Sequence, residues 1–324
     1  MEPEAAERRT GGYGFSILVG ILVLSIILRP TFRSVVDSGG VRTWSTIFVA
    51  ICLQAIPFLC LGVTLSGLIA ALMSDRALQR IIPRNKVLAV PFAGICGVAL
   101  PGCECGSVPI AGRLIGGGVP PAAALTFLLA APAVNPVVMV ATAVAFPNDH
   151  RVWMARFVGS MLTSIIMGWL WLAFGRTELL DRALARMPDG LTRRERFRQA
   201  AVHDLLHAGG YLIVGAAAAA AMQVVVPRSL LHGLGSHVVT GVIAMAVLAV
   251  VLSICSEADA FVASGLTEFS LTARLVFMVV GPGVDLKLIA MQSGVFSRRF
   301  ALFFAPMTLF VAVVVAVVVG TVML

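Results

Sequence analysis

Long, uninterrupted apolar segments constrain this chain more than any other feature of its sequence. Residues 300–324 carry no charged side chain over a length that suffices for a bilayer-spanning helix, which needs about 20 residues. Transmembrane β-barrels would instead show alternating segments of about ten residues. The sequence therefore predicts an all-α polytopic membrane protein. Predominantly apolar segments of similar length are residues 12–28, 44–73, 119–146, 152–175, 205–227 and 275–296.

Composition excludes most other classes of protein. Hydrophobic residues make up 59% of the 324 residues and charged residues only 12%, whereas soluble domains carry about 25% charged residues. The net charge of +8 does not indicate nucleic-acid binding, because the arginines cluster in short loops, as topology determinants do. The Gly116–Gly118 run lacks a following lysine, so no ATP-binding motif is present, and we expect no cofactor.

Two apolar segments, residues 87–101 and 238–255, are too short or too interrupted for simple crossings. If both are re-entrant hairpins and the N-terminus is cytosolic, most arginines lie inside, including those of the loop 176–203. If both cross fully, the positive charges are exported or divided almost evenly. We therefore favour seven crossings and two broken or re-entrant hairpins, within an overall range of about 7–10 transmembrane segments.

A weak internal repeat supports this topology. An offset of 150 residues aligns Cys105 with Cys255 and Pro132 with Pro282, and it places Asn135 on Asp285. Each half then has the same order of helix, hairpin, helix with an internal proline, and final helix, which predicts two inverted repeats; chance similarity of apolar segments is the alternative. The predicted divisions are an N-terminal tail with a first helix (1–43), repeat 1 (44–175), a basic cytosolic loop or interfacial helix (176–203) and repeat 2 (204–324).

Four acidic residues lie at or near the helix breaks: Glu104, Glu257, Asp259 and Asp285. An ionised side chain at the bilayer centre costs roughly 2.5–3.5 kcal/mol, so such residues normally line a cavity or a transport path. We expect the two hairpin tips to meet near the midplane, with Glu104, Glu257 and Asp259 exchanging protons. The alternative places these acids in water at a loop mouth, most simply for Glu257.

Cysteines accompany the acids at both tips. Cys103 and Cys105 flank Glu104, and Cys255 occupies the equivalent place in the second half. Thiolates select soft, thiophilic metals and metalloids, so these three are candidate substrate ligands. Asn135 and Asp285 each follow a helix-breaking proline by three residues and are further candidate substrate ligands, although Lys287 is an alternative partner for Asp285.

Four motifs in order resemble the ArsP/YraQ-type permeases: residues 101–109 (PGCECGSVP), 127–136 (FLLAAPAVNP), 255–263 (CSEADAFVA) and 281–287 (GPGVDLK). The resemblance extends from about residue 44 to the C-terminus. It implies an inner-membrane permease, and the family's best-known activity is the efflux of trivalent organoarsenicals through cysteine thiols. Glu104 departs from the family pattern, in which serine is common at this position, and its carboxylate would also suit a divalent cation.

Three hypotheses follow for the function. The first is a proton-driven secondary permease that exports a thiophilic small species such as an organoarsenical, and the second is a permease for Zn²⁺ or a similar divalent cation. The third, which we rank last, is a membrane thiol-redox protein that uses Cys103 and Cys105. We therefore expect no enzymatic activity. The expected location is the inner (plasma) membrane, and the expected partners are lipid and a small molecule or ion. We expect no nucleic acid, while a second copy or an accessory protein stays open.

Overall fold

The computed structural model describes residues 39–72, 82–83, 85–99, 103–180, 192–225 and 238–324. The predicted first helix, 12–28, lies outside these residues. The chain divides into two compact units, Met1–Ile47 and Phe48–Leu324, and the packing reported below is that of the second unit. All regular elements among the described residues are helices, which confirms the predicted fold class.

Five stretches of the described chain are long and apolar enough to cross a membrane. They comprise α3 (Gly39–Leu72), the pair α7 (Pro121–Val134) and α8 (Pro136–Ala145), α9 (Arg151–Phe174), α11 (Arg193–Val225) and α16 (Arg298–Met323). Leucines, isoleucines and valines remain exposed on the outer faces of these helices, as a lipid environment permits. The multi-pass membrane prediction is therefore confirmed.

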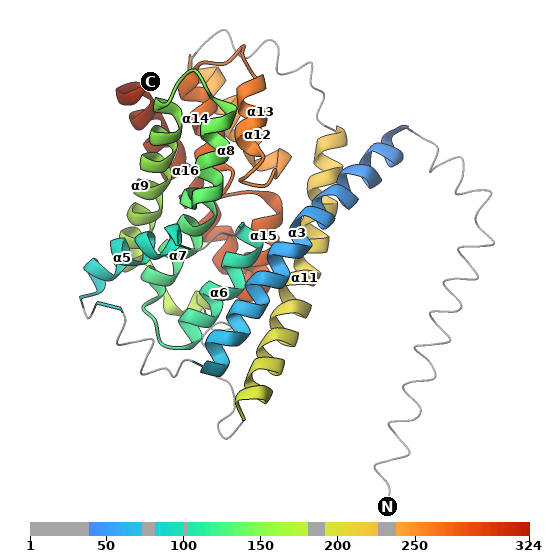
Figure 1. The fold of residues 1–324 in the computed structure, drawn as a ribbon, viewed down its shortest axis with the longest axis vertical. Coiled ribbons are helices and arrows are strands. Elements are labelled where there is room, and N and C mark those ends of the chain that lie inside the picture. Colours follow the sequence, from blue (N-terminus) through green and yellow to red (C-terminus); the bar gives the residue numbers. More distant parts are fainter. Residues whose placement is uncertain (1–38, 73–81, 84, 100–102, 181–191, 226–237) are drawn as a thin grey trace, which may run out of the picture. The chain divides into compact units, whose positions relative to one another are not determined.

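Both segments predicted as hairpins contain a break between two shorter helices. The first consists of α5 (Lys86–Val98) and α6 (Glu104–Gly116), and the second of α12 (Val238–Leu252) and α13 (Asp259–Gly265). In the second break Ser253 has a positive φ of 46°, which turns the chain away from the axis of α12. Figure 1 shows α5 and α6 below α12 and α13 in the view.

Contacts at the ends of the first hairpin place its two open ends on the same side of the protein. Trp169, near the end of α9, donates its indole N–H to the Val87 carbonyl at the start of α5. Arg113, in the last turn of α6, forms an ion pair with Asp204 of α11. Trp169 lies in the last part of α9, and Asp204 lies in the first half of α11, the next α-helix along the chain. This arrangement agrees with a re-entrant path for α5 and α6.

A second kind of break interrupts the helices that follow the hairpins. Asn135 separates α7 from α8, and its side-chain oxygen accepts a hydrogen bond from the Val138 amide at 3.0 Å. Residues Gly281–Asp285 separate α14 (Leu271–Val280) from α15 (Leu286–Val295), and Asp285 accepts from the Leu288 amide at 2.6 Å. The two side chains therefore cap equivalent helices. The predicted crossing 275–296 is thus two helices rather than one kinked helix.

The helix bounds repeat along the chain with the predicted offset. Helix α8 covers 136–145 and α15 covers 286–295, while α7 begins at 121 and α14 at 271. The following helices, α9 and α16, run antiparallel, because Ser297 at the start of α16 donates to the Leu179 carbonyl just beyond α9. An inverted repeat requires this opposite direction, although the inversion of the complete halves remains a prediction.

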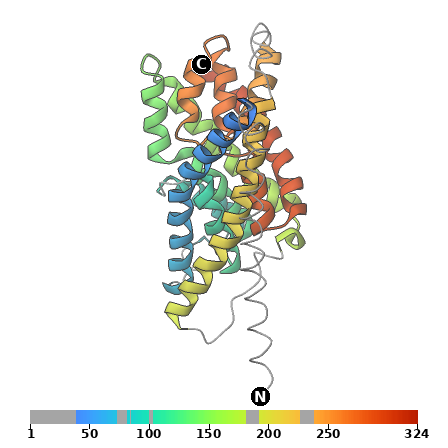
Figure 2. The same ribbon diagram turned by 90° about the vertical axis from the view of Figure 1, so that its right-hand side faces the viewer.

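Close backbone contacts hold the long helices to the hairpins. A Cβ atom on Gly62 of α3 would lie 2.3 Å from the Gly106 Cα of α6, so only glycine permits this approach. Helix α3 also contacts α11, since the Ser66 hydroxyl donates to the Asp204 carboxylate at 2.5 Å. Both views show the two long helices side by side (Figure 1 and Figure 2).

Candidate functional site

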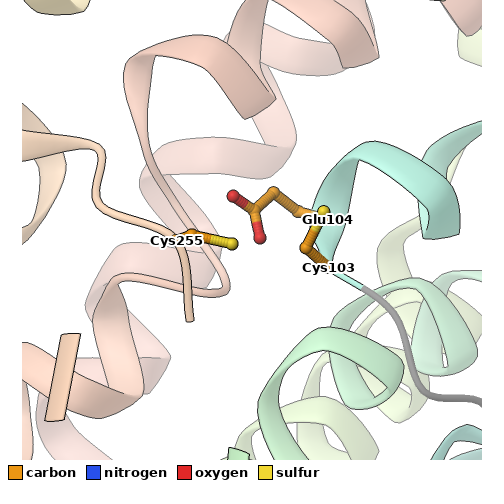
Figure 3. Close-up of side chains that lie close together, drawn as sticks. All are labelled: Cys103, Glu104 and Cys255. Atoms are coloured by element: carbon orange, nitrogen blue, oxygen red, sulfur yellow. The ribbon is translucent and has the colours of Figure 1, made fainter. Parts of the chain in front are cut away.

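The two hairpin breaks bring three potential ligand groups together. Sulfur atoms of Cys103 and Cys255 and a carboxylate oxygen of Glu104 all lie within 4.8 Å of one another, and all three residues are buried. Figure 3 shows Cys103 and Glu104 at the start of α6, facing Cys255 on the segment that follows α12. The predicted meeting of the two tips is thus present in the fold, while the roles of the residues stay predictions.

Cys105 completes the group of thiols. Its side chain is 1% exposed, and it interacts with the Cys103 thiol, which also interacts with Cys255. All three are free cysteines. Three thiols from two separate segments therefore gather at one buried place, which we name the thiol cluster (Cys103, Cys105 and Cys255).

A buried lysine faces the thiol cluster. The Lys287 ammonium lies 2.5 Å from Glu104 Oε1 and 3.6 Å from Asp285 Oδ2, and the three side chains are at most 3% exposed. The predicted pair with Asp285 is therefore the longer of its two ion pairs. Glu104 Oε1 is thus engaged by Lys287, whereas Glu104 Oε2 has no hydrogen-bond partner among the described residues.

Glu257 also reaches the thiol cluster. The Cys255 thiol donates to Glu257 Oε2 at a separation of 2.5 Å, and the Glu257 side chain is partly buried. This contact links one candidate proton carrier directly to one candidate substrate ligand. A carboxylate placed in this way can receive the thiol proton when the sulfur binds another atom.

Asp259 belongs to a different polar cluster, built around an arginine that the sequence reasoning missed. Arg156 of α9 is fully buried and donates to Asp259 Oδ2 at 2.8 Å, to the Thr142 hydroxyl at 2.8 Å and to the Ser256 carbonyl at 3.1 Å. The signal was present, since a lone arginine within the apolar segment 152–175 calls for a buried partner.

Asn135 stabilises the break between α7 and α8. Its amide donates to the Ala131 carbonyl at 3.0 Å while its oxygen caps α8, and the residue is fully buried. Asp285, its counterpart, caps α15 and lies near Lys287. Of these two predicted substrate ligands, Asp285 is therefore the one with a described contact to Lys287, which faces the thiol cluster.

A small, mostly apolar pocket borders the thiol cluster. Its wall is formed by α3, α6 and α7 and includes Phe58, Gly62, Cys103, Phe127 and Ala131. Cys103 thus lines an apolar pocket and also lies close to Glu104, Cys105 and Cys255. The arrangement can hold a soft atom on sulfur while an attached organic group occupies the pocket.

Comparison with known proteins agrees with the sequence resemblance. A family model described as "Predicted permease", of the ArsP type, matches residues 41–321. The UPF0718 protein YcgR of Bacillus subtilis (strain 168) is 38% identical over 285 residues, which cover 84% of this chain and 94% of the relative. A "putative two-component membrane permease complex subunit" of Streptococcus mutans is 34% identical over 283 residues, covering 85% and 94%. No solved structure matches. The chain therefore belongs to the ArsP-type family of predicted permeases.

Proposed function

We propose that this chain is a secondary permease that exports a thiophilic small species, such as a trivalent organoarsenical, in exchange for protons. The observation that carries the proposal is the thiol cluster, in which two helix breaks bring Cys103, Cys105 and Cys255 together beside an apolar pocket. Trivalent arsenic is a soft centre that forms bonds to sulfur, and the pocket offers space to its organic substituent.

The binding chemistry balances with neutral thiols. An organoarsenical with two hydroxyl groups reacts with two thiols to form two As–S bonds, and the hydroxyl groups leave as two water molecules with the thiol protons. No net proton is released, so a buried, uncharged pair of thiols suits this substrate. Cys103 and Cys255 approach from different hairpins, so the substrate would join the two repeats through its two sulfur bonds.

Proton coupling is assigned to Glu104, Glu257 and Asp259. Glu257 accepts a hydrogen bond from the Cys255 thiol, so it can relay the thiol proton to the departing hydroxyl group when the As–S bond forms, and relay a proton from water back to the sulfur when the substrate leaves. Asp259 is held by Arg156, so its protonation would break an ion pair between α9 and α13. Alternating access would follow from rocking of one repeat against the other around the thiol cluster.

The proposed location is the inner (plasma) membrane with a cytosolic N-terminus. The streptococcal relative is named as a subunit of a two-component complex, which supports an accessory protein as partner for this chain, with a homo-oligomer as the alternative. Transport rather than catalysis is the proposed role of the buried thiols.

Growth of an arsenical-sensitive host provides the test. Expression of the chain should raise resistance to methylarsonous acid, and Cys103→Ser or Cys255→Ser should abolish this gain. Cys60→Ser is the matched control, because Cys60 is exposed on α3 and is not part of the thiol cluster. Unchanged resistance upon expression of the native chain, shown to be inserted in the membrane, would refute the arsenical substrate.

A divalent-cation permease is the second candidate, and the geometry of Cys103, Glu104 and Cys255 favours it. Two sulfurs and one carboxylate oxygen within 4.8 Å form a donor set that Zn²⁺ accepts. If the cation is the substrate, Glu104→Gln should reduce radiotracer flux in proteoliposomes more than Cys103→Ser. Equal or larger loss in Cys103→Ser would instead favour the thiophilic species.

A further inference from the structure

One buried cation distinguishes this thiol site from an ordinary metal centre. The donor set of Cys103, Glu104 and Cys255 has the composition of a metal site, yet the Lys287 ammonium already lies 2.5 Å from Glu104 Oε1. A protein ammonium and a divalent cation both bind to carboxylate oxygens. Lys287 therefore competes with a metal ion for Glu104 and adds a positive charge beside its sulfur ligands.

The fold holds Lys287 in this position. Lys287 is the second residue of α15 (Leu286–Val295), and Asp285 from the preceding break caps this helix. Helix α11 packs directly on it, because a Cβ atom on Gly215 would be only 2.6 Å from the Lys287 Cα. The side chain is 3% exposed, so the ammonium is oriented toward Glu104 and Asp285 rather than toward solvent.

The charge of a substrate decides whether it can bind beside the Lys287 ammonium. Two positive charges a few ångströms apart repel strongly in a buried site, where the effective dielectric constant is far below that of water. A neutral arsenical that exchanges hydroxyl groups for thiols does not experience this repulsion. The same three donor groups should thus bind a divalent cation poorly and accept an uncharged thiophilic molecule.

We propose that Lys287 determines specificity at the thiol cluster, by occupying the cation position on Glu104 and excluding divalent metal ions. This inference rests on the proposed function for the identity of the substrate, but its central claim concerns which ions the site rejects. Removal of the ammonium should convert the cluster into a binding site for a soft divalent cation.

Cadmium titration of the purified, full-length protein in lipid nanodiscs tests the inference, because Cd–thiolate bonds give an ultraviolet charge-transfer band. Lys287→Met should bind Cd²⁺ at least about 100-fold more tightly than the native chain, equivalent to about 2.7 kcal/mol. Lys287→Arg, which keeps the charge, should show no such gain. Adding Cys255→Ser to Lys287→Met should remove the gained binding and its thiolate band.

Two results would overturn the inference. One is a native chain that binds Cd²⁺ as tightly as Lys287→Met, and the other is tight binding that survives loss of Cys255. If Lys287→Met does not fold, Lys287→Met combined with Asp285→Asn removes one charge of each sign and serves in its place. Methylarsonous acid binding to the native chain and to Cys255→Ser is measured in parallel, so failure of the arsenical substrate is recognised separately from failure of cation exclusion.

Discussion

Arg156 and Asp259 form a buried ion pair, and their contributions to the free energy of unfolding should be strongly coupled. Both side chains are buried, at 0% and 2% exposure, and the contact distance is 2.8 Å. Arg156→Met leaves the Asp259 carboxylate without this cation and removes donors from Thr142 and Ser256. Breaking a buried ion pair costs about 3–5 kcal/mol, so we expect a loss of that size in the free energy of unfolding.

A double-mutant cycle measures the coupling. Asp259→Asn keeps the shape of the side chain but leaves Arg156 as the uncompensated charge, so it should cost about as much as Arg156→Met. In the double variant neither charge remains, and the loss should be smaller than the sum of the single losses by about 2–3 kcal/mol. The assay is unfolding by SDS in mixed micelles, followed by tryptophan fluorescence.

Additivity would refute this reasoning. If the losses of the two single variants sum to that of the double variant within about 0.5 kcal/mol, Arg156 and Asp259 do not act as a pair. Arg113→Met offers a comparison at a less buried ion pair, since Arg113 and Asp204 are 17% and 13% exposed and their contact is longer, at 3.4 Å. Its loss should be well below that of Arg156→Met.

Three further predictions concern packing and helix breaks. Gly62→Ala should destabilise the chain by about 1–3 kcal/mol in SDS unfolding, because its Cβ would meet the Gly106 backbone; Gly210→Ala, with nothing within 4 Å, is the control and should change stability by less than about 0.5 kcal/mol. Asn135→Ala should cost about 0.5–2 kcal/mol in the same assay through loss of the α8 cap, and no loss would contradict that role. Trp171→Ala should lower the thermal midpoint measured by fluorescence-detected gel filtration, since its ring packs on Phe300 and Phe304; an unchanged midpoint would argue against this contact.

Much of the fold could be predicted because lipid imposes simple requirements. Apolar length identified α3, α9, α11 and α16, and the combination of cysteine and an acid at 103–106 and 255–259 located both hairpin breaks. These positions were recognisable because a charged side chain within an apolar segment costs free energy, so its presence indicates a functional or buried polar site. The prolines at 132 and 282 and the offset of 150 residues placed Asn135 and Asp285 at equivalent breaks.

The partners of the charged residues could not be predicted from local sequence. Lys287 is two residues from Asp285, which suggested that pair, yet its shorter contact is with Glu104 from a hairpin far away in the chain. Arg156 and Asp259 are 103 residues apart in the chain, and only the three-dimensional fold brings them together. Charge pairs of this kind depend on three-dimensional distance, which periodicity and spacing do not encode.

The positions of the ion pairs suggest how the two repeats are held together. With the predicted boundary at residues 176–203, Glu104 and Lys287 lie in different repeats, and so do Arg156 and Asp259, as well as Arg113 and Asp204. Each charge in these three pairs is therefore paired with an opposite charge from the other repeat. Separating the repeats would leave these charges unpaired in lipid or in the protein interior. If rocking of the repeats moves a substrate, these contacts must lengthen in part of the cycle. A substrate bound to Cys103 and Cys255 would bridge the same boundary through two sulfur bonds, and could thereby offset the loss of an ion pair as the site changes sides.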